Sequence, residues 1–172
     1  MMAREYSWYL RSMGEKPLAE SVSPGHAQVY RVVVLPPYSS PVVVRLCVET
    51  SGIAELVVKV GHSDRNPEVL AVNRITDVSH QDVHKFLKLL NDADFWSVPT
   101  TEPWGRRLGK PIAPATVMGD TNWMLEAIKE GGYHLVYRGA SNLGSLKDSV
   151  VFLVVSVAKV DLRSLPTQPA PR

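Results

Sequence analysis

The first half of the chain is dominated by short apolar segments that predict β-strands. Residues 27–35 (AQVYRVVVL) are rich in β-branched side chains and end at a Pro-Pro pair, which cannot donate hydrogen bonds to a sheet. Residues 42–50 and 54–61 alternate with a period of two, as expected for strands with one face toward a core, and residues 69–75 form a weaker fourth candidate. Polar turns separate these segments, so we expect a meander of antiparallel strands.

The clearest helix is predicted to begin after Ser79. The Ser79 hydroxyl can cap the first turn, and Asp82, three residues later, completes a capping-box pattern. Apolar side chains then follow at helical spacing, at Val83, Phe86, Leu87 and Leu90. Asn91-Asp92 is expected to end this helix.

Residues 122–138 (NWMLEAIKEGGYHLVYR) are the most informative segment, because they are typical of a complete β-hairpin. Two strand-forming segments flank residues 130–132 (Glu-Gly-Gly). The paired glycines are expected to supply the positive φ that a tight connection needs. Large apolar side chains on both strands should provide its buried surface.

Glu126, His134 and Arg138 are the groups of this hairpin that are capable of chemistry. A carboxylate, an imidazole and a guanidinium on one sheet face can bind an anion or carry out acid–base catalysis. If Lys129 lies opposite Tyr133, Glu126 shares a face with the other two residues. If the two glycines alone form the turn, Glu126 lies on the opposite face from His134 and Arg138. The alternative to a ligand site is a cross-strand ion pair that sets the register, with His134 hydrogen-bonded locally.

The C-terminal part of the chain contains one long apolar segment, residues 149–160 (SVVFLVVSVAKV). Its β-branched content favours a strand, whereas its length and the capping pattern of Ser145 and Asp148 favour a buried helix, which we expect. Residues 165–172 (LPTQPAPR) are proline-rich and are expected to form a flexible tail.

These elements predict one α+β domain. We expect a single antiparallel sheet of five or six strands, packed against one central helix and a C-terminal helix, over residues 27–164. Residues 1–26 contain several prolines and glycines and are expected to form an N-terminal arm. With 172 residues, of which 45% are hydrophobic, the chain can bury a genuine core.

Charge and cysteine content exclude several classes of protein. The 19 basic and 17 acidic residues give a net charge of +2, which does not favour nucleic acid or an anionic membrane as a partner. The single cysteine, Cys47, cannot form an internal disulfide, and no thiol pair is present to build a zinc site. The N-terminal residues lack the apolar core of a secretory signal, so we expect a cytoplasmic protein.

Two further patterns resemble functional sites. His80 and His84 stand four residues apart on the predicted helix, a spacing that suits a metal, but no third ligand is evident and no metal is expected. Residues 100–120 are rich in glycine and proline and predict a long irregular loop that carries Trp104, Arg106 and Arg107. A solvated loop is the simpler interpretation of these basic residues.

Part of the sequence resembles a group of small bacterial proteins with no assigned activity. The similarity lies in residues 28–46 (QVYRVVVLPPYSSPVVVRL), in residues 94–102 (DFWSVPTTE) and in the motif W-x-L-E-x(5)-G-Y-H-x-V-x-R at residues 123–138. It spans about Tyr30 to Ser141. The resemblance is specific as a marker of a family, and it implies no reaction.

The sequence favours a non-enzymatic protein-binding protein, and specifically a bacterial immunity protein that neutralises a cognate toxin. Small size, the lack of a convincing catalytic set and the surplus of aromatic residues point this way. In this interpretation Trp104 and Tyr137 anchor the toxin, while Arg106 and Arg107 pair with its acidic groups. No cofactor is expected, and a homo-oligomer is compatible with the sequence. The alternative is a small-ligand-binding protein or an enzyme that uses the three ionisable residues of the hairpin.

Overall fold

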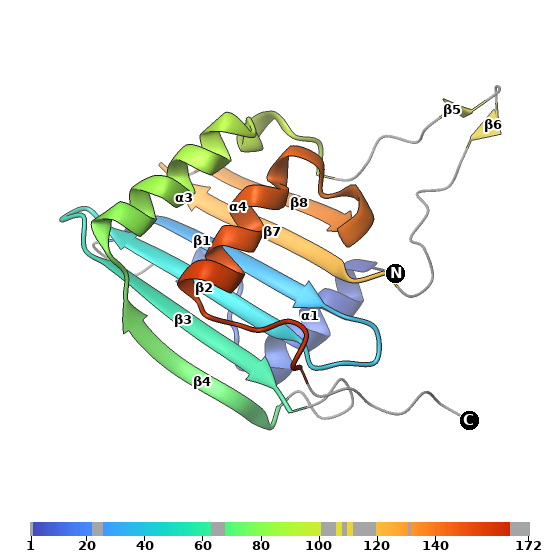
Figure 1. The fold of residues 1–172 in the computed structure, drawn as a ribbon, viewed down its shortest axis with the longest axis horizontal. Coiled ribbons are helices and arrows are strands. Elements are labelled where there is room, and N and C mark those ends of the chain that lie inside the picture. Colours follow the sequence, from blue (N-terminus) through green and yellow to red (C-terminus); the bar gives the residue numbers. More distant parts are fainter. Residues whose placement is uncertain are drawn as a thin grey trace.

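The fold is built on one six-stranded antiparallel sheet with the strand order β4-β3-β2-β1-β7-β8 (Figure 1). The computed structural model describes residues 2–21, 26–62, 68–100, 106–107, 110–111, 120–130 and 132–165. The strands of the sheet are β1 (His26–Leu35), β2 (Val42–Glu49), β3 (Ala54–Gly61), β4 (Leu70–Asp77), β7 (Asn122–Lys129) and β8 (Gly132–Gly139). A separate two-stranded ribbon consists of β5 (Arg106–Arg107) and β6 (Lys110–Pro111).

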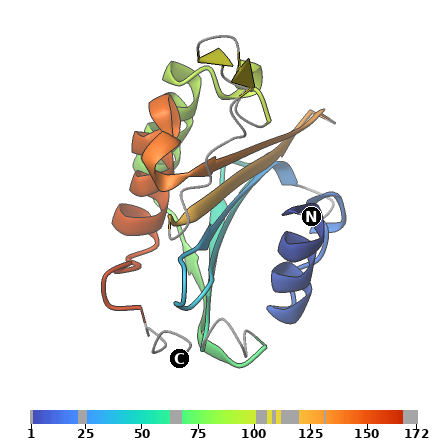
Figure 2. The ribbon, with the colours of Figure 1, turned by 90° about the vertical axis from the view of Figure 1, so that its right-hand side faces the viewer.

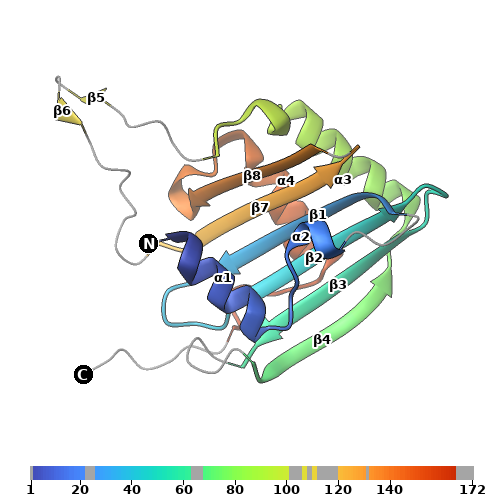
Figure 3. The ribbon, with the colours of Figure 1, turned by 180° about the vertical axis from the view of Figure 1, so that it is seen from behind.

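Helices cover both faces of the sheet (Figures 2 and 3). One face packs against α3 (His80–Asp92) and α4 (Lys147–Val151), and α4 continues as a π-helical segment, η4 (Phe152–Val157). The other face packs against α1 (Met2–Ser12) and α2 (Leu18–Ser21). Three 3-10 turns complete the described helices: η1 (Phe95–Ser97), η2 (Ala140–Asn142) and η3 (Gly144–Leu146). The α+β architecture predicted from the sequence is therefore confirmed, whereas the expectation of a single buried sheet face is wrong.

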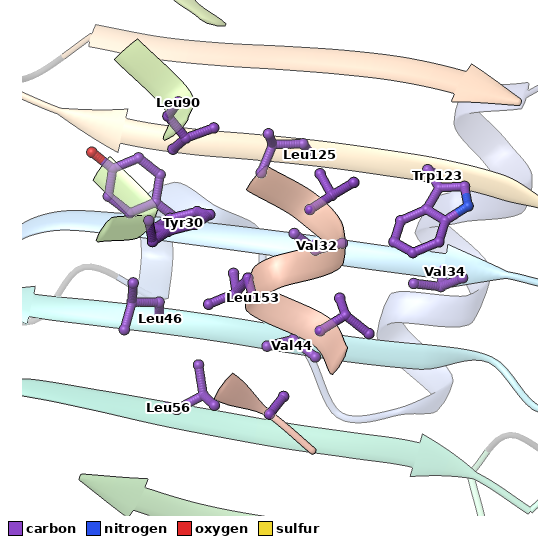
Figure 4. Close-up of a cluster of buried hydrophobic side chains, with 14 of the residues drawn as sticks. Tyr30, Val32, Val34, Val44, Leu46, Leu56, Leu90, Trp123, Leu125 and Leu153 are labelled. Atoms are coloured by element: carbon purple, nitrogen blue, oxygen red, sulfur yellow. The ribbon is translucent and has the colours of Figure 1, made fainter. Parts of the chain in front are cut away.

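The main core lies between the sheet and the α3–α4 layer (Figure 4). Alternate residues of the central strands point into it, as the period-two pattern predicts. Its members include Tyr30, Val32 and Val34 of β1, Val44 and Leu46 of β2, Leu56 of β3, Trp123 and Leu125 of β7, Leu90 of α3 and Leu153 of η4. Each such side chain stabilises the fold by about 1.5–3 kcal/mol when it is fully buried.

The two predicted helices form, but only one is capped as expected. The Ser79 hydroxyl accepts a hydrogen bond from the backbone N–H of Asp82 at 3.1 Å, which satisfies an otherwise unpaired donor in the first turn of α3. Ser145 does not cap α4. Its hydroxyl donates to the carbonyl of Ala93, because α4 follows directly from the 3-10 turn η3 and Leu146 occupies the cap position.

The predicted hairpin forms from β7 and β8, with Lys129 opposite Gly132. The positive φ that the connection needs is adopted by Glu130, at +53°. Gly132 belongs to β8, so the expectation that both glycines of the turn supply the positive φ is wrong for Gly132, and Gly131 lies outside the described residues. None of the described helices is both long enough and apolar enough to span a membrane.

Candidate functional site

The register of the hairpin separates the three ionisable residues that were predicted as a possible ligand site. Glu126 lies opposite Leu135, whereas Ala127 lies opposite His134. Neighbouring residues of a strand point to opposite faces, so Glu126 faces α1 and α2 while His134 and Arg138 face the α3 layer. The three side chains therefore do not form a common site.

Glu126 instead forms a buried ion pair with Arg31, its direct partner on β1. The Glu126 carboxylate oxygen Oε1 accepts from Nε and Nη2 of Arg31 at 2.7 and 2.6 Å, so two guanidinium donors converge on one oxygen. Charge-assisted hydrogen bonds of this length are among the strong polar contacts in proteins. The other oxygen, Oε2, accepts from the Tyr133 hydroxyl at 3.1 Å. Burial, and then the charge of Glu126, raise the pKa of Tyr133.

A second carboxylate, Glu15, binds three cations of the same sheet face. Its oxygen Oε2 lies 3.2 Å from Nη1 of Arg31 and 3.3 Å from Nε of Arg45, and its Oε1 lies 2.7 Å from Nζ of Lys59. We call the five residues Glu15, Arg31, Arg45, Lys59 and Glu126 the ionic cluster. It crosses the sheet from β3 to β7 beneath the N-terminal segment.

The backbone after α1 supplies further acceptors to the ionic cluster. The helix ends at Ser12, and Gly14 adopts a left-handed φ of +65°, a common way for a helix to terminate. Lys59 donates to the carbonyls of Met13 and Gly14 at 2.9 and 3.1 Å, where the helix dipole favours a cation. Arg31 donates to the carbonyl of Lys16 at 2.7 Å.

The ionic cluster fixes the N-terminal segment on the sheet. The side chains of Arg31, Glu15 and Glu126 are almost completely buried, and a buried charge is tolerated only when it is paired and hydrogen-bonded. Met13 and Leu18, on either side of Glu15, are buried against separate small apolar clusters of the sheet. Glu15 is therefore the polar centre of an otherwise apolar contact between the segment and the sheet.

Sequence reasoning missed this cluster, although its signal was present. Arg31, Arg45 and Lys59 are each the one Lys or Arg of a largely apolar strand, at a position where a half-exposed face was expected. A charge at such a position indicates a buried partner when the face is covered. The partners could not be named, because the register relates Arg31 to a carboxylate 95 residues away.

His134 and Arg138 hold the chain that follows η1. The His134 ring nitrogen Nε2 lies 3.0 Å from the carbonyl of Val98, and the ring packs edge-on against Phe95. Arg138 donates to the carbonyls of Pro99 and Thr100 at 2.7 and 3.1 Å. These two residues therefore bind backbone of their own chain along β8.

Asp120 closes the corner where β8 ends. Its carboxylate oxygen Oδ2 accepts from the backbone N–H and the hydroxyl of Ser141 at 3.1 and 2.7 Å. Desolvation opposes ionisation, but these bonds, with those from the backbone of Thr121 and Ala140, lower the pKa of Asp120 overall. A Cβ atom at Gly139 would lie 2.7 Å from Oδ2, so glycine permits this close approach.

Large aromatic side chains are exposed near the hairpin end of β8. Tyr133 is 55% exposed on the face toward α1, and Trp96 is 42% exposed on the other side, where its ring lies 5.9 Å from that of His134. Tyr137, one of the predicted anchors, is instead half-buried against the apolar cluster around Met13. Of the other predicted partner-binding residues, Trp104 lies outside the described residues, and Arg106 and Arg107 form β5, with only their backbone described.

Within the described ranges, no group of three His, Cys, Asp or Glu side chains is arranged to hold a metal ion. His80 lies beside the turn between β2 and β3, where a Cβ at Gly52 would be 3.3 Å from its ring carbon Cε1. His84 is exposed on α3.

No protein-family model matches this chain, and no curated protein is significantly similar to it in sequence.

Proposed function

We propose that this chain is a non-catalytic protein-binding protein, and specifically an immunity protein that neutralises a bacterial toxin by covering the toxin's functional surface. One observation supports the proposal most directly. Glu126, His134 and Arg138 of the hairpin each bind other parts of the same chain, while Tyr133 and Trp96 leave large rings exposed beside them. Exposed aromatic anchors are typical of protein interfaces, whereas a catalytic acid or base must be within hydrogen-bonding reach of a substrate.

The exposed rings belong to a surface that we call the β8 edge, defined by Trp96, Tyr133, His134 and Leu135. His134 and Leu135 are half-buried, so the rings project from a fixed base. A rigid base lowers the entropy that is lost when a partner binds. Tyr133 and Trp96 serve as anchors on the two sides of this edge.

The long segment that is expected to contact the toxin is flanked by two residues bonded to β8 and to the 3-10 turn η2 that follows it. The backbone N–H of Tyr137 donates to the carbonyl of Thr100 at 2.8 Å, and the N–H of Ala140 donates to that of Thr121 at 2.8 Å. Thr100 and Thr121, the described residues that flank this segment, are therefore both held at the C-terminal end of β8. In the proposed complex, Arg106 and Arg107 pair with acidic groups of the toxin and steer its approach.

The test is co-purification of this protein with the products of the two adjacent open reading frames, followed by titration of the toxic activity of the bound product. We expect stoichiometric neutralisation. Trp96→Ala and Tyr133→Ala should each raise the dissociation constant by about 30-fold, as expected for residues that contribute about 2 kcal/mol. Tyr133→Phe keeps the ring and should retain most of the affinity.

Ile53→Ala is the matched control, because Ile53 is equally exposed but lies in the turn between β2 and β3. It should bind as tightly as the wild type. Failure of the protein to bind either neighbouring product would contradict the immunity function. Binding that is unchanged in Trp96→Ala and Tyr133→Ala would contradict the assignment of the β8 edge.

A further inference from the structure

The strand β4 forms one edge of the sheet, opposite to the edge formed by β8 (Figure 1). Its second half, from Asn73 to Asp77, is exposed on both faces, and Ile75 at its centre is 61% exposed. Within the described residues, β4 pairs only with β3. Long exposed edge strands are templates for pairing with another chain.

The hydrogen-bonding pattern shows which backbone groups of β4 remain available. The N–H of Val78 donates to the carbonyl of Ala54 at 2.9 Å, which makes these two residues a hydrogen-bonded pair with β3. Antiparallel ladders alternate between hydrogen-bonded and non-hydrogen-bonded pairs. Thr76 and Arg74 therefore direct their backbone groups toward β3, while those of Asn73, Ile75 and Asp77 point away from the sheet.

These outward groups match each other in one two-fold arrangement. If two copies of β4 pair in antiparallel orientation with Ile75 opposite Ile75, then Asn73 of each copy lies opposite Asp77 of the other. All three outward residues then fall in hydrogen-bonded pairs. The Asn73 amide can donate to the Asp77 carboxylate, and the exposed isoleucines contact each other across the axis.

The neighbouring two-fold registers are less favourable. Centring the pair on Arg74 places two guanidinium groups opposite each other, and centring it on Asp77 places two carboxylates opposite each other. Centring it on Thr76 places the apolar Ile75 opposite the charged Asp77. Of the registers centred on Arg74, Ile75, Thr76 and Asp77, the one centred on Ile75 therefore has the fewest unfavourable pairs.

We propose that β4 is the interface of a homodimer, in which two copies of this chain join edge to edge at Ile75 into one continuous twelve-stranded sheet. The interface is isologous, as in most two-fold dimers. It lies at the far edge of the sheet from β8, so dimerisation and toxin binding use separate surfaces. The two proposals can therefore fail independently.

The test is sedimentation equilibrium of the full chain over a range of concentrations. The wild type should be dimeric. Ile75→Pro should be monomeric and folded, because it removes an outward N–H that β3 does not use. Asn73→Asp places carboxylates opposite Asp77 at two symmetric positions and should raise the dimer dissociation constant by about tenfold.

The double variant Asn73→Asp/Asp77→Asn exchanges the two members of the pair and should restore the wild-type dissociation constant. Only the register centred on Ile75 predicts this rescue. Ile53→Lys is the control, because Ile53 is also exposed but lies in the turn between β2 and β3. This variant removes exposed apolar surface away from β4 and should leave the dimer intact. A monomeric wild type at all concentrations, or a dimer that is unaffected by Ile75→Pro and Asn73→Asp, overturns the proposal.

Discussion

Arg31 and Arg45 are direct cross-strand partners on β1 and β2, and Glu15 Oε2 lies within 3.3 Å of both guanidinium groups. Two like charges at such positions destabilise a sheet when nothing separates them. Glu15 comes from the N-terminal segment rather than from the sheet. The central strands therefore depend on this segment for their charge balance as well as for cover.

Replacing Glu15 should strongly destabilise the fold. Glu15→Gln removes the negative charge that Arg31, Arg45 and Lys59 share, and leaves three cations close together beneath the N-terminal segment. Breaking a buried ion pair by removing one partner costs about 3 kcal/mol or more. Urea denaturation should show this loss in the free energy of unfolding.

Glu20→Gln is the control, because Glu20 is an exposed acidic residue of the neighbouring helix α2. It should change the free energy of unfolding by less than about 0.5 kcal/mol. Adding Lys59→Met to Glu15→Gln removes one of the unpaired cations and should recover part of the loss. A small effect of Glu15→Gln would mean that Glu126, together with water or backbone carbonyls, can balance the three cations.

The corner formed by Gly139 and Asp120 should show strong coupling between two substitutions. Gly139→Ala places a Cβ atom 2.7 Å from Asp120 Oδ2, although the backbone of Gly139, at φ −72° and ψ 155°, suits alanine. We expect a cost of about 1 kcal/mol, since the Asp120 side chain must move and its hydrogen bonds to Ser141 are weakened. Urea denaturation measures it.

In an Asp120→Ala background the same Gly139→Ala change should be neutral or slightly stabilising. The carboxylate that clashes is absent there, and alanine reduces the freedom of the unfolded chain. The double-mutant cycle should therefore give a coupling free energy of about 1 kcal/mol or more. Additive effects would show that crowding at Gly139 arises from the backbone rather than from Asp120.

Tyr30 should make stability depend on pH in the alkaline range. Burial, and then the charge of Glu130, raise the pKa of Tyr30 from 10.0 to about 12. Between these values the unfolded chain loses the phenolic proton while the folded chain keeps it. The contribution of Tyr30 is therefore present below pH 10.0 and decreases as the pH rises toward about 12, by about 1.4 kcal/mol per pH unit.

The measurement compares the wild type with Tyr30→Phe at a series of pH values. At neutral pH the variant should be less stable by about 1 kcal/mol, because the Tyr30 hydroxyl donates to Gln28 Oε1 in the wild type. This difference should shrink and then reverse as the pH increases past 10.0. A difference that is constant with pH would show that the Tyr30 hydroxyl titrates as it does in the unfolded chain.

The elements that were predicted correctly have a local signal in the sequence. Alternation with a period of two gave β2 and β3, β-branched content gave β1, strand-forming segments around a glycine pair gave the hairpin, and the Ser79 cap with helical spacing gave α3. The apolar segment after Ser149 gave the C-terminal helix, although its true entry is through a 3-10 turn. Local patterns of this kind need no knowledge of tertiary contacts.

The parts that were not predicted depend on register or on distant segments. The face of Glu126 is decided by whether Lys129 lies opposite Gly132 or Tyr133, and a shift of one residue inverts every side chain. The packing of α1 on the second sheet face could not be inferred, because residues 1–26 are equally compatible with an extended N-terminal arm. As long as that cover is unknown, Arg31 and Arg45 are interpreted as solvent-facing.

The hydrogen bonds that hold Thr100 to β8 and Thr121 to η2 have an evolutionary consequence. Insertions between these two anchor points leave the spacing of the sheet unchanged, and each doubling of such a segment's length costs only about 0.6 kcal/mol in closure entropy. If the proposed toxin binding holds, sequence changes that alter the target can accumulate in that interval, while selection for folding acts on the strands.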